Sequence, residues 1–488
     1  MERPSVDDYF SDWKQREAFV QEMIPVIGRL FSQRNVDILI YGRPLHNRSV
    51  TFIMKSHRFV RQAERNEMSE FETHPVLMAM EKLDLWHAQI DLGKLTVKYM
   101  KHQDKKGAEA ETADDFVRQE LGYLDGNKRK PIDKSQDVVL YGFGRIGRLM
   151  ARLLIERTST GEVMRLRAIV VRPAGTDDIE KRASLFTADS VHGAFQGTLR
   201  VDEENNCLIA NGNVIKVIHA DSPDEIDYTK YGINDALIID NTGKWRDEEG
   251  LALHLKAKGA SKVILTAPGK GSLKNIVYGI NDDEIMEDDN IVTAASCTTN
   301  AIAPVLKVVN DKLGIEHGHI ETVHAYTNDQ NLIDNYHKKS RRGRSAALNM
   351  VLTDTGAAKA VVKVVPDLAG KLTGNAIRVP TPNVSMAIMN LTLRQETNKE
   401  KLNEFLRDIA LHSKLQNQIS YTESKDAVSS DFVGTREAGI VDSNATIVNG
   451  KNCVLYLWYD NEFGYCCQVA RMVYKMAGVS YQAYPVET

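Results

Sequence analysis

The chain has 488 residues, of which 42% are hydrophobic and 26% are charged, an ordinary composition for a soluble protein of two or three domains. Its formal net charge of −4 gives the whole molecule no electrostatic reason to bind nucleic acid or anionic membranes. A run of about 18 apolar residues, as a membrane-spanning helix needs, is not found. The first twelve residues also lack the basic-then-apolar order of a secretory signal. We therefore expect a cytoplasmic protein with no nucleic-acid or membrane partner.

The cysteines point to the same compartment. They are few and odd in number, and none is arranged in metal-ligand pairs: Cys207, Cys297, Cys453, Cys466 and Cys467. A reducing environment is the simplest interpretation, and no metal site is predicted. The adjacent Cys466 and Cys467 are expected to be two packed thiols on one helix rather than a functional disulfide.

The first quarter of the chain is expected to be helical. From Phe10 to Leu30 apolar residues recur at three- and four-residue steps, which is typical of an amphipathic helix. Further helices are predicted at 50–65, 75–83, 85–101 and 113–124, with a charged loop at 101–112. We expect an all-α N-terminal extension at 1–124 and a polar linker at 125–137. A packing or oligomerisation module is its simplest role; covering the active-site mouth or binding a regulator are alternatives.

The pattern changes at Val138. Short apolar runs at 138–140, 168–171, 236–239 and 263–265 alternate with helix-length segments, which predicts a mostly parallel sheet. Longer alternating segments at 384–393 and 454–458 predict an antiparallel sheet. The expected fold class is α/β, with a Rossmann dinucleotide-binding domain at 138–297 and an α+β catalytic domain at 298–460. A C-terminal helix at 461–488 is expected to return to the dinucleotide-binding domain.

A glycine-rich turn follows the first of these strands. Gly142, Gly144 and Gly147 form the pattern G-x-G-x-x-G, which lets the backbone turn sharply and approach a pyrophosphate at a helix N-terminus. The next strand ends in Arg172, which cannot accept a hydrogen bond from a ribose hydroxyl but can pair with a 2′-phosphate. The turn predicts NADP or NAD as cofactor, with NADP acceptance favoured. The alternatives are a turn without a ligand and a solvated arginine.

A cysteine and a histidine are the candidates for covalent catalysis. Cys297 opens a helical pattern after an apolar strand, and the helix macrodipole is expected to lower its pKa and favour the thiolate. His324 ends another apolar strand, 27 residues later, and histidine suits proton transfer near neutral pH. Each residue alone is more often structural, and their spacing does not show that they meet.

Five segments in order carry a family resemblance: 142–148 (GFGRIGR), 295–300 (ASCTTN), 323–327 (VHAYT), 355–360 (TGAAKA) and 458–465 (WYDNEFGY). Over about 136–477 the chain resembles phosphorylating glyceraldehyde-3-phosphate dehydrogenase; the first 130 residues carry no resemblance. The resemblance implies interconversion of glyceraldehyde 3-phosphate plus phosphate and 1,3-bisphosphoglycerate. Cys297 would form a thioester, His324 would act as general base, and hydride would pass to NAD(P). It also implies a homotetramer.

The same resemblance assigns the remaining site residues. Thr327 and Arg378 would hold one of the two phosphates, the sugar phosphate and inorganic phosphate, that the reaction binds. The other phosphate would be held by Ser296, Thr298, Thr355, Gly356 and Arg344. The cofactor would be held by Gly142, Gly144, Arg145, Ile146, Gly147, Arg172, Thr242, Thr266, Asn461 and Tyr465.

The chain departs from the family pattern at several positions. Asn335-Tyr336 replaces a Leu-Pro pair common in NAD-dependent members, and Tyr141 stands where Asn is usual. Leu352 and Asp354 stand where Pro and Ser are usual, and a carboxylate at Asp354 could weaken phosphate binding. Asp354-Thr355 and the segment 334–337 are also similar to erythrose-4-phosphate dehydrogenase, which is one alternative. The other is a regulatory or scaffolding protein that retains the dehydrogenase fold.

Overall fold

The computed structural model describes residues 6–107, 111–175, 177–353 and 355–486. The chain divides into two compact units. Unit 1 consists of Met1–Ser135, Ser159–Val163 and Val479–Thr488, and unit 2 consists of Gln136–Thr158 and Met164–Gly478. No helix among the described residues is long and apolar enough to cross a membrane.

Unit 1 is mainly helical, as expected. Its helices are α1 (Val6–Arg34), α2 (Val50–Glu64), α3 (Glu70–Glu81), α4 (Leu92–Lys106) and α5 (Ala113–Leu121). The later part of the apolar stripe of α1 is buried, with Met23, Ile27 and Leu30 almost inaccessible to solvent, whereas Phe10 and Trp13 at its start are exposed. Burial of one such side chain stabilises the fold by roughly 1.5–3 kcal/mol, so this stripe fixes α1 in the core of the unit.

Two helix boundaries differ from the prediction. Helix α3 begins at Glu70 rather than near Pro75, because Ser69 and Glu72 form a capping box at its N-terminus. Residues 85–91 are not helical, and α4 runs from Leu92 to Lys106, into the first half of the segment predicted as a charged loop at 101–112. Asp91 caps this helix by accepting a hydrogen bond from the backbone N–H of Lys94 at 3.0 Å.

The expectation that this region has no strands is wrong. Unit 1 contains a sheet in the described residues with the order β2-β1-β3-β22, formed by Arg43–Pro44, Asp37–Ile40, Ala88–Asp91 and Gln482–Tyr484. Strands β1, β3 and β22 are parallel, and β2 is antiparallel to β1. These strands are two to four residues long, too short for side-chain alternation to reveal them in the sequence.

The last strand of unit 1 comes from the far end of the chain. The segment 461–488 was expected to be a helix, but α12 (Phe463–Met476) ends at Met476 and the chain continues into β22. Tyr123 donates a hydrogen bond from its hydroxyl to the Ala483 carbonyl at 2.6 Å. Both ends of the expected linker at 125–137 belong to regular contacts of the fold. Asp125 accepts a hydrogen bond from the Asp84 N–H at 2.8 Å, and strand β4 already starts at Gln136.

Unit 2 begins with the predicted Rossmann sheet. Its order is β13-β12-β11-β4-β5-β10-β9-β8, and the strands from β13 to β10 are parallel. The parallel strands are β4 (Gln136–Tyr141), β5 (Met164–Val171), β10 (Asn213–His219), β11 (Ala236–Asp240), β12 (Ala260–Leu265) and β13 (Ile291–Thr293). Strand β9 (Cys207–Ala210) extends the sheet antiparallel to β10, and β8 (Leu199–Asp202) pairs antiparallel with β9. The connecting helices include α6 (Arg145–Glu156), α7 (Asp178–Thr187) and α8 (Glu248–Lys256).

A second sheet follows, with the order β15-β16-β14-β17-β21-β19-β18. It is mainly antiparallel, but β14 pairs parallel with β16 and β18 pairs parallel with β19. Its strands are β14 (Ile315–Ala325), β15 (Val351–Thr353), β16 (Leu372–Val379), β17 (Ser385–Leu393), β18 (Ile419–Thr422), β19 (Gly439–Asp442) and β21 (Asn452–Tyr459), with β20 (Ile447–Asn449) paired to β21. Helices α10 (Ala357–Val364) and α11 (Lys399–His412) also belong to this part.

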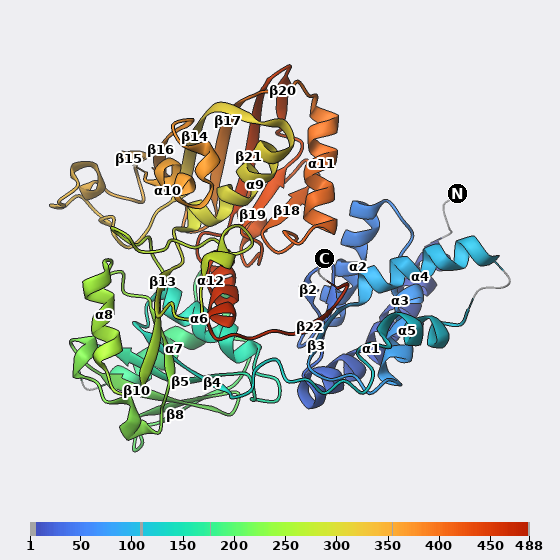
Figure 1. Cartoon of the computed structure of the whole chain (residues 1–488), viewed down its shortest axis with the longest axis horizontal. Coiled ribbons are helices and arrows are strands. Elements are labelled where there is room, and N and C mark those ends of the chain that lie inside the picture. Colours follow the sequence, from blue (N-terminus) through green and yellow to red (C-terminus); the bar gives the residue numbers. More distant parts are fainter. Residues whose placement is uncertain (1–5, 108–110, 176, 354, 487–488) are drawn as a thin grey trace. The chain divides into compact units, whose positions relative to one another are not determined.

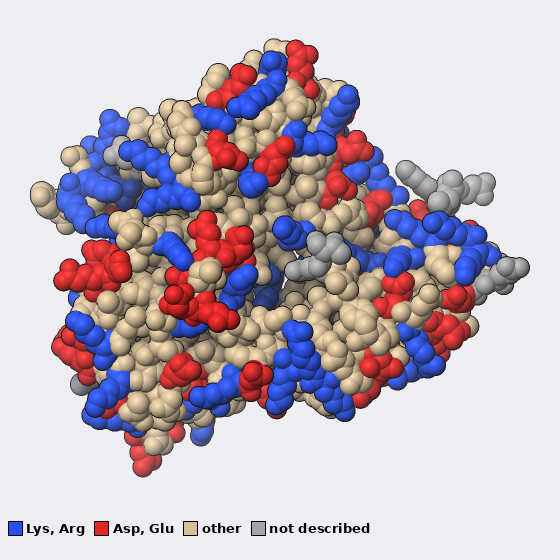
Figure 2. All heavy atoms as spheres, viewed as in Figure 1, with Lys and Arg blue, Asp and Glu red and all other residues tan. Residues whose placement is uncertain are grey.

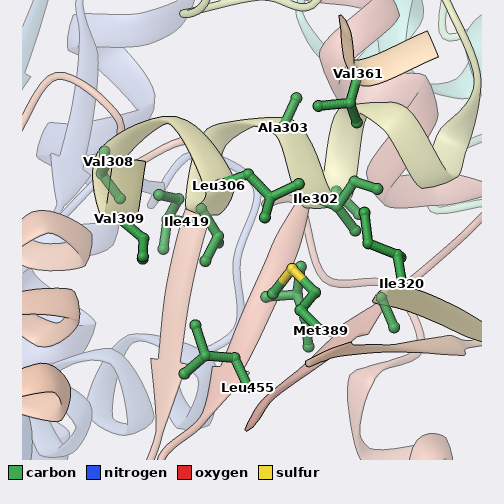
Figure 3. Packing of buried hydrophobic residues seen from close by; sticks show 14 of the residues in the cluster. Ile302, Ala303, Leu306, Val308, Val309, Ile320, Val361, Met389, Ile419 and Leu455 are labelled. Atoms are coloured by element: carbon green, nitrogen blue, oxygen red, sulfur yellow. The ribbon is translucent and has the colours of Figure 1, made fainter. Parts of the chain in front are cut away.

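Helix α9 (Cys297–Leu313) forms the centre of the second core. Figure 3 shows its apolar residues Ile302, Leu306 and Val309 facing the sheet, where Met389 and Leu455 lie. All five side chains are fully buried. Because this packing fixes the helix against β17 and β21, it also fixes the position of Cys297 at the helix N-terminus. Helix α12 packs against α6 (Figure 1).

Candidate active site

The candidate nucleophile lies at the start of α9. Ser296 caps the helix by accepting a hydrogen bond from the Thr299 N–H at 3.0 Å, so Cys297 is the first helical residue. Ala295 has a left-handed backbone (φ 52°), which is uncommon for a residue other than glycine. The Tyr465 hydroxyl donates a hydrogen bond to the Ala295 carbonyl at 3.0 Å and supports this turn. The backbone thus presents Cys297 from a braced turn.

His324, at the end of β14, meets the cysteine. Its Nε2 lies 3.6 Å from the Cys297 Sγ, and its Nδ1 lies 2.7 Å from the Ala325 carbonyl oxygen. The Arg378 Nη1 lies 2.8 Å from the same Nδ1, and a guanidinium can only donate whereas a carbonyl can only accept, so these two neighbours favour opposite tautomers. In the tautomer whose Nδ1–H donates to the Ala325 carbonyl, the Nε2 lone pair faces the thiol. The pairing that the spacing left open is therefore present in the structure, and in this tautomer Nε2 can take the thiol proton as a general base.

Burial dominates the ionisation of both groups. It raises the pKa of the Cys297 thiol above its ordinary value, and the opposing Arg378 charge does not offset it. Burial, assisted by the Arg378 charge, lowers the pKa of His324 to about 3. The expectation that the helix N-terminus alone favours the thiolate is therefore wrong, since desolvation outweighs the macrodipole here. Neither group ionises easily by itself, but a proton passing from Sγ to Nε2 creates both charges together and lets them attract each other.

Arg378 and Thr327 lie beside this pair. The Arg378 Nη1 is 3.0 Å from the Ala325 carbonyl oxygen and 3.4 Å from the Thr327 Oγ1. Strand β16 carries Arg378 directly opposite His324 of β14 in the parallel register. A guanidinium and a hydroxyl next to the thiol are suitable ligands for a substrate phosphate, so the structure brings together the first predicted anion-binding pair.

The second predicted anion-binding arginine is not at this place. The side chain of Arg344 is exposed, and its Nε donates to Asp334 at 2.8 Å. Its neighbour Arg342 is mostly buried, pairs with Asp329 and donates to the Thr353 Oγ1 at 3.1 and 3.2 Å. After burial and the Arg378 charge, the Arg342 charge also acts to lower the pKa of His324. The sequence pattern does not distinguish Arg342 from its neighbours, because Ser340–Gly343 is a short 3₁₀ helix without a long periodic pattern.

Several of the small residues assigned to the phosphates already have hydrogen-bond partners within the protein. The Thr298 Oγ1 is buried, 3.0 Å from the Tyr459 hydroxyl, and the Ser296 Oγ serves the helix cap. The Thr355 Oγ1 accepts a hydrogen bond from the Ala357 N–H at 3.1 Å, and Gly356 is the N-cap residue of α10. Asp354, where a carboxylate was expected to affect phosphate binding, lies outside the described residues.

The glycine-rich turn has the geometry that a dinucleotide requires. Gly142 has a left-handed backbone (φ 95°), and a Cβ atom at Gly147 would lie 2.3 Å from the Gly142 carbonyl oxygen. Only glycine fits both positions. Gly144 is the N-cap of α6 without a side-chain capping bond, and a Cβ atom there would meet nothing within 4 Å. The N-terminus of α6 is therefore open to an anion such as a pyrophosphate.

Arg145 and Ile146 of this turn both contact helix α12. The Arg145 guanidinium bonds Glu462 at 2.6 Å through Nε and Asp189 at 3.0 Å through Nη1. It therefore ties α6 to the start of α12, and only its backbone N–H stays available to a phosphate. The carbonyl oxygen of Ile146 lies 3.8 Å from the Cys466 Sγ on α12. Cys466 and Cys467 are free buried thiols on this helix.

The two threonines assigned to the cofactor, Thr242 and Thr266, both contact the carboxyl-terminal end of strand β11. Asp240, the last residue of β11, accepts a hydrogen bond from the Thr242 Oγ1 at 2.7 Å. The Thr266 Oγ1 donates to the Asp240 carbonyl at 3.1 Å. His254 pairs with the buried Asp240 carboxylate at 3.1 Å. Ligands of parallel sheets bind at this edge, so both threonines have a suitable location.

The other assigned cofactor residues occupy the same edge and the region near the thiol. Arg172 follows β5 and is exposed, and its carbonyl accepts a hydrogen bond from Arg182 at 3.0 Å. Asn461 is largely buried and accepts a hydrogen bond from the Ser385 Oγ at 2.8 Å.

Among the described residues, no group of three or more His, Cys, Asp or Glu side chains is placed to hold a metal ion.

Comparison with known proteins agrees with this geometry. A family model of the glyceraldehyde 3-phosphate dehydrogenase NAD-binding domain matches residues 136–248, and the C-terminal domain model of the same family matches residues 296–461. The chain belongs to the glyceraldehyde-3-phosphate dehydrogenase family. It is therefore an oxidoreductase of the family with a dinucleotide-binding Rossmann domain, and apart from Ser159–Val163 both matched ranges lie within unit 2.

Relatives differ in whether they share the extension. A glyceraldehyde-3-phosphate dehydrogenase-like protein of Pseudomonas aeruginosa (strain UCBPP-PA14) is 59% identical over 465 residues, which cover 95% of this chain and 100% of the relative. A glyceraldehyde-3-phosphate dehydrogenase of Zymomonas mobilis is 39% identical over 70% of this chain and 98% of the relative. A chloroplastic form A from Zea mays is 38% identical over 73% of this chain and 88% of the relative. The first match leaves out too few residues to omit the extension.

Proposed function

We propose that this protein oxidises glyceraldehyde 3-phosphate with inorganic phosphate to 1,3-bisphosphoglycerate, or catalyses the reverse reaction. The observation that carries the proposal is the 3.6 Å contact between the Cys297 Sγ and the His324 Nε2, with Arg378 beside it. A thiol with a correctly oriented base forms covalent intermediates with carbonyl carbons. The adjacent guanidinium selects a carbonyl compound that carries an anionic phosphate.

The chemistry assigned to the chain follows from these contacts. Sγ bonds to the aldehyde carbon while Nε2 of His324 takes the thiol proton. The imidazolium then donates a hydrogen bond towards the oxyanion that forms on the former carbonyl oxygen. After oxidation the acyl group is held on Cys297 as a thioester. A phosphate oxygen attacks the carbonyl carbon of this thioester and the C–S bond breaks. Cys297 leaves as a thiolate, which pairs with the His324 imidazolium or takes a proton back from it.

The residues fit a nicotinamide dinucleotide. The open N-terminus of α6 at Gly144 would hold the pyrophosphate, Thr242 and Thr266 would line the sheet edge, and Asn461 would bind the carboxamide. When bound, the nicotinamide ring supplies the hydride acceptor. NADP acceptance is proposed because Arg172 is exposed at the end of β5, where its guanidinium is free of the sheet and suits a 2′-phosphate.

Two phosphates need separate ligands in this proposal. Arg378 and Thr327 bind one, and Arg342 takes the role that the sequence assigned to Arg344 for the other, together with Ser296, Thr298, Thr355 and Gly356. The support for Arg342 is its burial against Thr353, two residues before Thr355. An exposed arginine held by Asp334, as Arg344 is, would lose most of its attraction for an anion to solvent screening.

We also propose that the protein is a cytoplasmic homotetramer. The loop between β14 and β15 exposes the apolar side chains of Leu332, Ile333, Tyr336, Leu348 and Met350, of which Tyr336 is 91% exposed. Exposed lysines and arginines of this loop surround them: Lys338, Lys339, Arg341 and Arg344. Figure 2 shows the basic side chains gathered over this loop at the left of the view. Contiguous exposed apolar side chains of this kind mark protein interfaces, and size-exclusion chromatography with light scattering tests the assembly.

Activity assays of the full chain test the proposed reaction. Purified protein is expected to reduce NAD(P) only when both glyceraldehyde 3-phosphate and inorganic phosphate are present, and Cys297→Ser is expected to abolish this turnover. Phosphate-independent turnover of erythrose 4-phosphate would replace the proposal with the erythrose-4-phosphate alternative. Absence of turnover with every aldehyde, together with ordinary iodoacetamide reactivity of Cys297, would favour a regulatory or scaffolding protein.

Cofactor preference is tested separately. Arg172→Ala is expected to raise the KM for NADP about tenfold and leave the KM for NAD unchanged, because only NADP offers a phosphate to this side chain. Lys181→Ala is a suitable control, since Lys181 is an exposed cation on the following helix that pairs with Asp177. Equal effects of Arg172→Ala on both cofactors would show that Arg172 does not recognise the 2′-phosphate.

A further inference from the structure

A buried serine connects the two sides of the candidate active site. Ser385 is the first residue of β17 and is 1% exposed. Its Oγ lies 3.0 Å from the Ala325 backbone nitrogen and 2.8 Å from the Asn461 Oδ1, and it also hydrogen-bonds Tyr459. A peptide N–H can only donate, so Oγ accepts from Ala325 and retains its own proton for Asn461.

This arrangement sets the direction of the Asn461 carboxamide. With Oδ1 held by the serine hydroxyl, the Nδ2 amino group must point to the opposite side. Nδ2 has no hydrogen-bond partner among the described residues, and it does not belong to the buried atoms that lack one. The amino group is therefore open to a ligand, although the residue as a whole is only 6% exposed.

The backbone before Ser385 is strained. Val384 has a left-handed conformation (φ 65°), which is a genuine outlier for a β-branched residue. Its side chain is buried in a small cluster with Phe432 and Ile440, with Trp458 packed against them. Strained conformations persist where the surrounding packing enforces them, and they gather at functional sites. The strain thus accompanies the turn that aims Ser385 at Asn461.

The same serine supports the catalytic histidine. The Ser385 Oγ holds the Ala325 N–H. The Ala325 carbonyl oxygen lies 2.7 Å from the His324 Nδ1 and accepts a hydrogen bond from the Arg378 Nη1 at 3.0 Å. On the other side, the Tyr459 hydroxyl that contacts Ser385 lies 3.0 Å from the Thr298 Oγ1, next to Cys297. One hydroxyl therefore links the backbone behind the base to the side chain assigned to the cofactor.

We propose that Ser385 is a positioning residue that turns the Asn461 amino group towards the carbonyl oxygen of a nicotinamide carboxamide. Asn461 then donates a hydrogen bond to that oxygen, while Ser385 keeps Ala325 in place behind His324. This inference rests on the proposed function, because it takes the dinucleotide as the ligand of Asn461. It adds to that function the hydrogen-bond direction of the carboxamide contact and the residue that determines it.

Steady-state kinetics of Ser385→Ala in the full chain test the proposal. The KM for the preferred nicotinamide dinucleotide is expected to rise about tenfold, the loss of one well-placed hydrogen bond, and kcat is expected to fall by a smaller factor because Ser385 also holds Ala325 behind His324. With the 3-acetylpyridine analogue, which keeps the carbonyl and replaces the amide NH₂ by a methyl group, the same rise is expected. With the thionicotinamide analogue, whose sulfur accepts weakly, the rise should be smaller. A rise that vanishes with the acetylpyridine analogue would mean that Asn461 accepts rather than donates, and would overturn the proposal.

A double-mutant cycle separates positioning from general stability. If Ser385 acts through Asn461, Ser385→Ala should add little to the KM effect of Asn461→Ala. Ser443→Ala is the matched control, because Ser443 is also buried but donates only to the Thr422 carbonyl at 2.8 Å. If Ser385→Ala does not fold, Ser385→Cys provides the same measurements with a weak donor. Active wild type with an unchanged KM in the variant would refute this inference alone, whereas inactive wild type would refute the proposed function.

Discussion

Arg342 pairs with Asp329 in the loop beside Arg378, whereas Arg344, two residues further along the chain, pairs with Asp334 in solvent. The two arginines offer a matched comparison. We expect Arg342→Ala to lower kcat/KM for inorganic phosphate about 100-fold, the range for removal of one charged ligand from a preorganised site. Arg344→Ala should change it less than twofold. Phosphate titrations of both variants measure this, and a larger loss in Arg344→Ala would restore the original assignment.

The cysteine–histidine pair makes a prediction about thiol reactivity. Burial raises the pKa of the Cys297 thiol, so a cysteine without its base should remain protonated at neutral pH. We expect His324→Asn to react with iodoacetamide at least tenfold more slowly than wild type at pH 7. Its rate should keep rising with pH beyond the ordinary thiol pKa. Peptide mapping of labelled Cys297 gives the rates, with Cys207→Ala as a control for background labelling. Identical rates in wild type and His324→Asn would show that the histidine does not take the thiol proton.

The lowered pKa of His324 predicts a loss of stability in acid. Burial and the Arg378 charge lower this pKa to about 3, so between that value and the unfolded value near 6.5 the unfolded chain binds more protons. Stability therefore rises with pH across this window. From pH 7 to pH 5 the histidine should cost about 2 kcal/mol of unfolding free energy, and His324→Asn should remove this component. Urea midpoints of wild type and variant at pH 5, 6 and 7 provide the test; parallel pH dependences in the two proteins would contradict it.

The C-terminal strand predicts a dependence of unit 1 on the end of the chain. Strand β22 pairs with β3, and Tyr123 bonds its backbone at 2.6 Å. We expect a chain that ends at Gly478 to lose hydrogen-exchange protection in β3 by at least tenfold, because its backbone groups lose their parallel partner. A chain that ends at Val486 is the control. Unchanged protection in the shorter chain would show that β22 contributes nothing to the sheet.

The sequence by itself determines those features of the molecule that depend on a local pattern of residues. The glycines of the 142–147 turn are needed whatever surrounds them, because Gly142 has a positive φ and Gly147 touches the Gly142 carbonyl. Apolar runs in the sequence predict β4, β5, β11 and β12 of the Rossmann sheet, whereas β10 is not among the predicted strands. The family motifs identify Cys297, His324 and Asn461 as site candidates through their order along the chain, and the resemblance of the chain between these motifs adds Arg378.

Tertiary structure decides which side chains meet and what their surroundings do to them. The parallel register of β14 and β16 places His324 opposite Arg378, and no spacing of 54 residues could have shown this. The choice between Arg342 and Arg344 depends on which one the loop buries. The sign of the Cys297 pKa shift also depends on burial, a property of the whole core around α9. Finally, β22 joins a sheet whose other strands lie about 390 residues or more away in sequence, and such long-range pairing leaves no local trace in the sequence.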